Sequence, residues 1–268
     1  MRRTAFGVMV VLVASVSVAW PYSLSQKVDG EALEDMAAGR YGQAITRLEK
    51  VLEALPESDA YWYRLTTKLA VCYEATGRFR KAAKEFENLS LHAYSYGPNR
   101  LCDSAGAARC ALLAGEKEEI GGWAAVLGYD AEGVQPLSPY CADETRAVIP
   151  NTYVVQGVLL SRAGRSAEAQ EAIGKAISTT ALQAENAVKC QSLAGAGCGG
   201  VRFLSWQGDL QGTYVANARL LRQAKRFVMA GFYYEAAQLI PGSIPAEAIG
   251  KEAKECAALK ATGLDVPK

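Results

Sequence analysis

Apolar side chains between residues 61 and 89 recur every three or four positions, in two runs that a single glycine separates. This spacing is typical of amphipathic helices, and glycine is the residue that most often follows the last turn of a helix. The segment therefore predicts two antiparallel helices joined by a tight turn. The positions that define this predicted hairpin are Leu69, Ala70, Tyr73, the turn residue Gly77, Ala82 and Phe86.

An earlier segment, residues 32–56, repeats the second half of this pattern. It carries Ala44 and Leu48 where the first segment carries Ala82 and Phe86, at a constant offset of 38 residues. Self-similarity at such a period is the sequence signature of a repeat protein. A single hairpin cannot bury its apolar face alone, so repeated hairpins are expected to stack on one another.

Two more diverged copies are predicted in the second half of the chain, at residues 150–177 and 217–240. Between the copies, residues 128–142 contain two prolines and predict a long loop. Residues 245–264 predict a last amphipathic helix that caps the array. In the two diverged copies the expected turn positions are Gly164 and Gly231, and the expected core positions are Ala169 and Ala236.

The motif of residues 69–86, L-A-x-x-Y, then G-x-F, then A-x-x-x-F, resembles the tetratricopeptide repeat (TPR), a helical hairpin of about 34 residues. The resemblance is closest over residues 32–89, extends to the two diverged copies, and does not reach residues 92–148 or 180–215. It implies an all-α fold, a TPR-like right-handed α-solenoid of helical hairpins. It also implies that the chain binds other proteins.

The family's best-known recognition feature is a clamp of Lys and Asn side chains that holds the terminal carboxylate of chaperones. The matching positions here are Thr67 and Val71, which cannot form the clamp, and this departure argues against a cochaperone. A groove built from the first helices of the hairpins is still expected. Its candidate protein-contact residues are Trp62, Tyr63, Arg64 and Lys68, against the competing interpretation that the aromatic ones belong to the repeat core.

The amino terminus carries an uncharged apolar run, residues 5–22, behind Arg2 and Arg3. Its length of about 17–18 residues is at the lower limit for crossing a bilayer. The run predicts one transmembrane helix as a membrane anchor at residues 1–22, before a TPR-like domain at residues 23–268. The anchor residues singled out are Val8, Val11, Leu12 and Trp20.

A second interpretation of the amino terminus is a secretory signal, because residues 17–19 form an acceptable cleavage site. The seven cysteines of the chain are odd in number, which argues against an oxidising periplasm. We therefore expect a mitochondrial inner membrane location, with export as the alternative. Disulfides at the two pairs spaced by eight residues, Cys102/Cys110 and Cys190/Cys198, are left open.

Charge and residue types exclude several other functions. A net charge of +1 provides no electrostatic basis for nucleic-acid binding. His92 is the only histidine, so mechanisms that need two imidazoles are excluded. Residues 195–200 match G-x-G-x-x-G but follow a predicted helix, whereas a dinucleotide site needs a preceding strand. No catalytic, cofactor or metal site is predicted.

The sequence thus predicts a non-catalytic membrane-anchored scaffold, an accessory subunit of a membrane protein complex such as a mitochondrial respiratory or ATP synthase complex. Its partners would be the other protein subunits and, through residues 5–22, the membrane. One alternative is a peptide-binding adaptor or assembly factor in protein quality control. An enzyme is the remote alternative, since such an activity requires a pocket with perturbed titratable groups.

Overall fold

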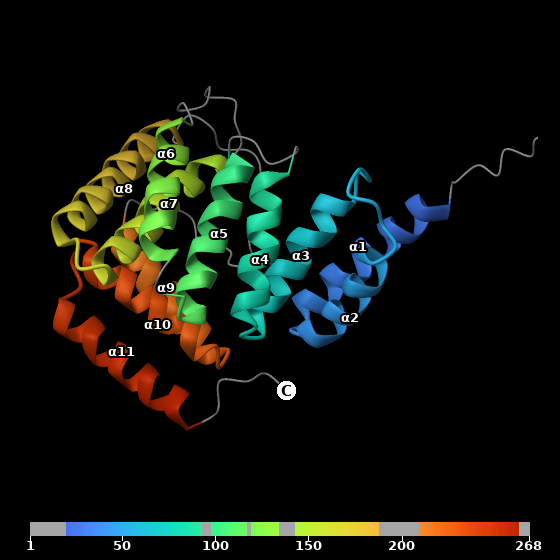
Figure 1. Ribbon diagram of the computed structural model, residues 1–268. Coiled ribbons are helices and arrows are strands. Elements are labelled where there is room, and N and C mark those ends of the chain that lie inside the picture. Colours follow the sequence, from blue (N-terminus) through green and yellow to red (C-terminus); the bar gives the residue numbers. More distant parts are fainter. Residues whose placement is uncertain (1–19, 93–97, 117–118, 134–142, 188–208, 263–268) are drawn as a thin grey trace, which may run out of the picture.

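The computed structural model describes residues 20–92, 98–116, 119–133, 143–187 and 209–262. These residues form helices and no strand, so the predicted all-α class is confirmed for the part of the chain described (Figure 1). The helices are α1 (Trp20–Ala37), α2 (Tyr41–Leu52), α3 (Trp62–Ala75), α4 (Phe79–Leu91), α5 (Pro98–Ala114), α6 (Ile120–Gly133), α7 (Asp143–Arg162), α8 (Ser166–Ala187), α9 (Leu210–Gln223), α10 (Phe227–Leu239) and α11 (Ala246–Ala261).

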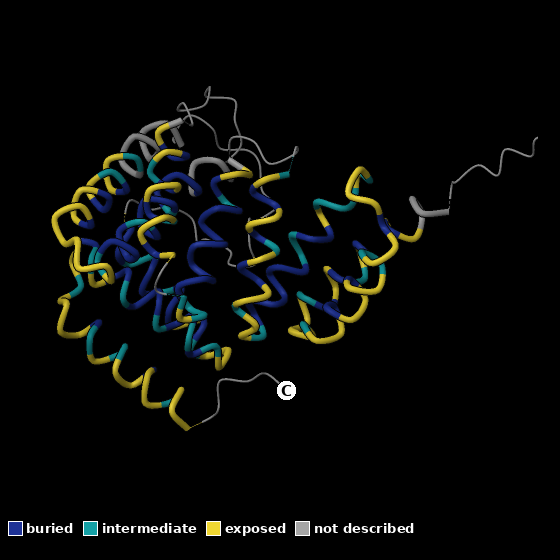
Figure 2. Tube along the Cα trace, viewed as in Figure 1, coloured by how far each residue is buried: buried dark blue, intermediate teal, exposed yellow. Residues whose placement is uncertain are grey.

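The first eight helices form four consecutive hairpins, α1–α2, α3–α4, α5–α6 and α7–α8. Within each hairpin the two helices contact one another, and the second helix also packs against the first helix of the next hairpin. Contact with the next hairpin buries the part of the apolar stripe that the two helices of one hairpin do not cover. Figure 2 shows buried residues on the sides where helices meet and exposed residues on the outer turns.

A glycine with a left-handed backbone ends the first helix of each of these hairpins. Gly39, Gly77, Gly115 and Gly164 have φ angles of 74°, 72°, 85° and 76°. At Gly77 two backbone bonds close the helix: the Gly77 N–H donates to the Glu74 carbonyl at 3.2 Å, and the next N–H donates to the Tyr73 carbonyl at 2.8 Å. This is the Schellman arrangement, which glycine favours because it lacks a Cβ.

The hairpin α5–α6 lies where the sequence resemblance was absent. Its turn glycine, Gly115, follows Gly77 by the same 38 residues that separate Gly77 from Gly39. Its first helix is rich in alanine, and Gly106 lets it approach α4 closely, since a Cβ there would lie 2.9 Å from the Phe86 ring. Alanine and glycine therefore replace the large residues of the repeat motif, and the pattern is lost although the hairpin remains.

Helix α6 differs from the expectation of a loop over residues 128–142. It extends to Gly133 despite several glycines, and residues 134–142 lie outside the described part of the chain. Ile120, Ala124 and Leu127 are buried in the main core cluster. Burial of this apolar face outweighs the weak helix propensity of glycine, which is about 1 kcal/mol less favourable than alanine.

The fourth predicted copy is displaced from its expected register. The left-handed turn residue is Lys225, with φ 58°, and Gly231 lies inside α10 rather than at the turn. Lys225 makes the same pair of backbone bonds as Gly77, to the carbonyls of Arg222 and, through Arg226, Leu221. Because α10 is apolar on most of its surface, hydrophobic spacing alone could not locate the end of the preceding helix.

The last three helices do not continue the stack. Among the described helices, α9 does not pack along α8 as the first helix of a fifth hairpin would. Instead α10 contacts α7 and α5, while α9 and α11 pack against α10 (Figure 1). The result is a three-helix unit, α9–α11, that lies across the first helices of the array.

The predicted anchor lies mostly outside the described residues. Of its singled-out positions, only Trp20 is described, as the first residue of α1, whereas Val8, Val11 and Leu12 belong to residues 1–19. Within the described ranges, no helix combines the length and the apolar character needed to cross a membrane. The division into residues 1–22 and 23–268 stays a prediction.

The position of the turn between α9 and α10 leads to a test with two substitutions, one that adds a glycine and one that removes a glycine. We expect Lys225→Gly to stabilise the fold by about 1 kcal/mol, because a non-glycine residue in the left-handed region is strained by roughly 1–2 kcal/mol. Gly231→Ala should also stabilise, by roughly 0.5–1 kcal/mol, since it lies inside a helix and an added Cβ meets nothing within 4 Å. Chemical denaturation midpoints measure both; a destabilising Gly231→Ala would contradict this register.

Candidate protein-binding face

The first helices of the four hairpins, α1, α3, α5 and α7, form one face of the array, which we call the inner face. Adjacent members are joined by direct contacts between α1 and α3 and between α5 and α7. Side chains join α3 to α5: the Tyr63 hydroxyl donates to Asp103 at 2.5 Å, and Arg109 contacts Glu74 at 2.7 Å. The predicted protein-contact residues all lie on α3, one of these helices.

Two of these predicted residues, Arg64 and Lys68, bind the same carboxylate. Arg64 Nη2 lies 2.8 Å and Lys68 Nζ 2.5 Å from the two oxygens of Asp29 on α1. The Arg64 side chain is nevertheless 61% exposed, whereas that of Lys68 is 16% exposed. Lys68 thus mainly joins α3 to α1, and Arg64 also presents a guanidinium group to the solvent.

The two aromatic residues, Trp62 and Tyr63, are half-buried and contact His92. The Trp62 and His92 rings are stacked with centroids 4.9 Å apart, and the Tyr63 ring lies 6.0 Å from the same imidazole. His92 caps α4, and its Nε2 is 3.3 Å from the Glu57 carbonyl oxygen. The sole histidine therefore belongs to an aromatic cluster that holds the ends of α3 and α4 together.

The two positions of the missing clamp provide no donor toward the inner face. The Thr67 hydroxyl donates to the carbonyl of Tyr63 one turn earlier, at 2.8 Å. Val71 is buried, with 5% of its surface exposed. A terminal carboxylate would find neither an amide nor an ammonium group at these two positions.

A buried ion pair, Glu74 with Arg109, joins the carboxyl-terminal halves of α3 and α5. The Nε and Nη2 atoms of Arg109 both lie 2.7 Å from Glu74 Oε1, and the two side chains are only 9% and 2% exposed. Burial by itself would lower the pKa of Arg109, but the adjacent Glu74 carboxylate outweighs this and raises it. Sequence reasoning missed this pair, because nothing in the helical pattern brings positions 35 residues apart together.

The thiol of Cys110 lies against the same ion pair. Its Sγ is 3.5 Å from Glu74 Oε1 and donates to that oxygen. Burial and then the Glu74 carboxylate raise the pKa of Cys110 well above its usual value, so this thiol stays protonated and unreactive. Burial likewise raises the pKa of Cys72 to about 12.

Helix α10 covers this part of the inner face. Tyr233 is buried beside the ion pair, and burial, opposed by Arg109, raises the pKa of its hydroxyl. At the amino end of α10 the Arg226 guanidinium lies 5.9 Å from the Tyr41 ring centroid. Toward its carboxyl end, Glu235 accepts two bonds from Arg162 of α7, at 2.8 Å from Nε and 2.5 Å from Nη2.

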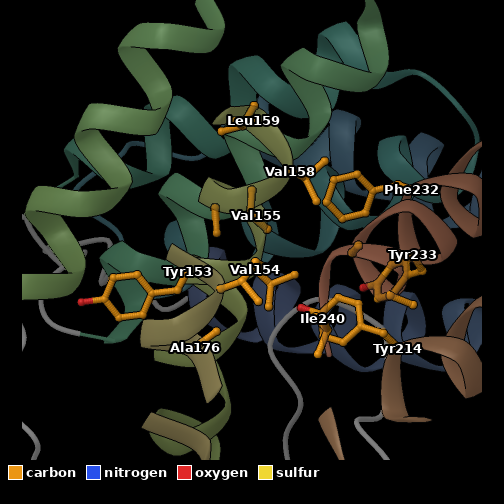
Figure 3. Packing of buried hydrophobic residues seen from close by; sticks show 14 of the residues in the cluster. Tyr153, Val154, Val155, Val158, Leu159, Ala176, Tyr214, Phe232, Tyr233 and Ile240 are labelled. Atoms are coloured by element: carbon orange, nitrogen blue, oxygen red, sulfur yellow. The ribbon is translucent and has the colours of Figure 1, made fainter. Parts of the chain in front are cut away.

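Helix α9 adds a polar contact and an aromatic pair. The Tyr214 hydroxyl donates to Asn151 Oδ1 on α7 at 2.7 Å, and the Tyr214 and Tyr233 rings lie 5.4 Å apart. Figure 3 shows Tyr214, Tyr233 and Phe232 beside the valines of α7, including Val158. All of these apolar side chains belong to one core cluster.

The inner face therefore has two parts. The open part consists of α1 and the amino-terminal half of α3, where Asp29, Arg64 and Lys68 lie. The closed part consists of the carboxyl-terminal halves of α3, α5 and α7, which α10 covers.

The repeat-core positions lie mainly between helices. Gly77 and Gly164 form helix turns, and Gly231 lies partly exposed within α10. The predicted core residues that are buried are Leu69, Ala70, Tyr73, Ala82, Phe86, Ala44, Leu48, Ala169 and Ala236.

Other candidate chemistry is limited in the described residues. Cys72, Cys102, Cys110 and Cys256 form no disulfide, so the pair Cys102/Cys110 that the sequence left open is not bridged; Cys190/Cys198 lies outside the described residues, as does the glycine-rich stretch 195–200. No group of three or more potential metal-ligating side chains occurs within the described ranges.

The buried ion pair leads to a double-mutant test. We expect Arg109→Leu to destabilise the fold by roughly 3–5 kcal/mol, because it leaves the Glu74 carboxylate buried without a partner. Glu74→Leu combined with Arg109→Leu should cost less, since no charge remains. Chemical denaturation measures both, with Arg165→Leu, at an exposed ion pair of α8, as a control that should resemble the parent. A double variant less stable than Arg109→Leu alone would contradict this interpretation.

Comparison with known proteins supports the repeat assignment. Residues 35–100 match the sequence model of the tetratricopeptide repeat family. These residues include α2, α3 and α4 and the two turns at Gly39 and Gly77. No curated protein matches the chain significantly in sequence.

Among the solved structures that match the chain, two are of a putative kinesin light chain of Podosopora anserina with nearly identical TPR-like repeats. The first is 16% identical, has a TM-score of 0.47, and aligns over 87% of this chain and 98% of its own. The second, a single-substitution form, is 15% identical, has a TM-score of 0.49, and aligns over 90% and 98%. The family match over residues 35–100 and the hairpins observed there confirm the predicted resemblance: residues 35–100 carry diverged tetratricopeptide repeats.

Proposed function

We propose that this chain is a non-catalytic scaffold that serves as an accessory subunit of a membrane protein complex. The observation that carries the proposal is the tetratricopeptide match over residues 35–100, since repeats of this family generally mediate contacts between proteins. The stacked hairpins extend this architecture to α8 and provide a large surface for such contacts.

The inner face supports a binding role better than a catalytic one. Its charged groups are paired with one another, Asp29 with Arg64 and Lys68, and Glu74 with Arg109. A general acid or base must be able to reach a substrate proton, and the buried pair is shielded from solvent. The single histidine is engaged in the aromatic cluster with Trp62.

The open part of the inner face is the proposed contact site for another subunit. The exposed guanidinium of Arg64 can make paired bonds to a carboxylate, which gives both direction and strength to a contact. Beside it lies the Tyr61 ring, 5.8 Å from the Arg64 guanidinium carbon. An acidic segment of a partner would fit this combination.

The alternative of a peptide-binding adaptor in quality control receives less support. Such an adaptor needs an inner face that is open along its length to receive extended segments from many clients. Here α10 covers the closed part, and Arg162 with Glu235 holds it at its far end. We therefore favour a lasting partner over a transient one.

The proposed membrane location rests on the apolar run at residues 5–22. Helix α1 begins at Trp20, so an anchor at that position would hold the first hairpin close to the bilayer surface. We propose the mitochondrial inner membrane, on the cysteine usage of the chain, with an exported location as the alternative.

Co-purification tests the proposed contact site. We expect the full-length chain to migrate with one large complex after mild detergent extraction of its native membranes. Arg64→Glu should reduce this association at least about tenfold, because a lost charge-assisted pair at an interface costs roughly 2 kcal/mol or more. Arg165→Glu changes an exposed arginine directly before α8, away from the inner face, and is the matched control. Equal association of both variants would contradict the assigned site, and reproducible turnover by the purified chain would contradict a non-catalytic role.

Membrane extraction tests the proposed anchor. We expect the full-length chain to stay in the membrane pellet after alkaline carbonate washing, and a form lacking residues 1–19 to move to the supernatant. An apolar helix of about 17 or more residues partitions into the bilayer core, whereas the charged helices that follow do not. Mass spectrometry of the intact chain distinguishes an anchor from a signal, because a chain that begins near residue 20 would show that the segment is removed.

A further inference from the structure

The contact between α10 and the inner face runs across three hairpins. The amino end of α10 meets the turn of α3–α4, where Glu74 and Phe79 line a small pocket together with Arg226 and Met229. At the centre of α10, Tyr233 lies beside the ion pair of Glu74 on α3 with Arg109 on α5. Its carboxyl end binds α7 through Arg162 and Glu235. Helix α10 therefore lies across the array and is not one of its stacked hairpin helices.

This contact differs from the stacking that joins the hairpins to one another. In the array, the second helix of each hairpin packs along the first helix of the next, whereas the described parts of α8 and α9 lack such a contact. Helix α10 is instead held by its own neighbours: Tyr234 donates to Glu252 of α11 at 2.9 Å, and the Cys256 thiol donates to the Phe227 carbonyl at 3.3 Å. The unit α9–α11 can thus keep its internal contacts without the inner face.

The chemistry of the contact is that of an interface with an apolar centre and a polar rim. Phe232 lies beside Val158 in the centre (Figure 3). The rim contains the half-exposed pair Arg162 with Glu235, whereas the bond from Tyr214 to Asn151 joins a fully buried tyrosine to a partly exposed amide. The Nε atom of Arg226 is buried and finds no hydrogen-bond partner among the described residues. An unpaired buried donor makes a contact weaker than a fully satisfied core.

We propose that the closed part of the inner face is a helix-binding site, which α10 covers in the isolated chain and which a partner helix occupies on assembly. The partner helix has the chemistry of α10 at this surface: adjacent aromatic residues, as at Phe232 and Tyr233, followed two positions later by a carboxylate that binds Arg162. The inference rests on the proposed function, since it specifies the partner of the same scaffold. Self-coverage keeps the valines of α7 out of water until that partner is present.

The test weakens these two polar contacts in the full-length chain. Asn151→Ala removes the acceptor of the Tyr214 hydroxyl, and Glu235→Arg places a second positive charge against Arg162; neither change removes an apolar core residue. The control is Glu132→Arg. Glu132 of α6 forms an exposed ion pair with Lys175 of α8, at 3.0 Å, so this change affects two helices of the array and not α10. A thiol introduced by Val158→Cys, beneath Phe232, reports whether the closed part opens.

Alkylation followed by peptide mass spectrometry measures the opening. We expect the introduced thiol to react at least tenfold faster in the Asn151→Ala/Glu235→Arg chain than in the parent or the Glu132→Arg control. Cys256, buried between α10 and α11, is the internal reference and should stay unreactive, because α9–α11 moves as one unit. Equal acceleration of both thiols would show that the whole chain unfolds together and would overturn the proposal. Asn151→Ala alone provides a milder variant if the double variant does not fold.

Binding of a labelled peptide tests the second half of the proposal. A fluorescent peptide of residues 226–240 should bind the double variant at least tenfold more tightly than the parent. The same peptide with Phe232→Asp and Tyr233→Asp should not bind. Equal binding of the two peptides, or no binding to a chain whose introduced thiol is accessible, would overturn the assignment as a helix site. Neither measurement uses a native partner, so a failure to find a membrane complex would count against the proposed function and leave these results intact.

Discussion

The rest of this structure depends on one constraint: no hairpin of the chain can bury its apolar face alone. Each first helix after α1 is covered by its own second helix and by the hairpin before it, so burial proceeds along the chain from neighbour to neighbour. The left-handed turn after each first helix makes this possible, because it returns the chain antiparallel within three to five residues. The same constraint acts on α7, whose apolar valines are covered by α10, since no later hairpin among the described helices stacks beside them.

The buried ion pair between α3 and α5 fixes where α10 lies on the inner face. A carboxylate and a guanidinium taken out of water need close partners on every side, and Arg109 and Glu74 provide them for each other. With Cys110 and Tyr233 packed around the pair, α10 meets a buried polar contact at its centre, in addition to the ion pair of Glu235 with Arg162. Buried polar contacts of this kind fix the register of two apolar surfaces that could otherwise pack in several ways.

The sequence predicted the fold better than the surfaces. Aromatic and small residues at helical spacing identified the hairpin around Gly77, and the family match confirms it. The hairpin at Gly115 was not recognised as a further repeat because alanine replaces the large residues, although the regular spacing of Gly39, Gly77 and Gly115 was a usable signal. The turn at Lys225 could not be predicted from the positions of glycines, because a lysine occupies the left-handed position. Contacts between distant helices, such as Glu74 with Arg109, depend on how the hairpins stack, and helical spacing does not record this.

The position of α10 late in the chain has a consequence for biosynthesis. The ribosome releases α1–α8 before α10 exists, so the valines of α7 first meet water rather than the aromatic residues that later cover them. At a synthesis rate of about 5–20 residues per second, the stretch from Arg162 to Ile240 takes roughly 4–16 seconds. For that interval the nascent chain presents an apolar surface in the crowded space near the ribosome exit. A chaperone that binds nascent apolar segments would meet this chain at that stage, before its last hairpin closes the inner face.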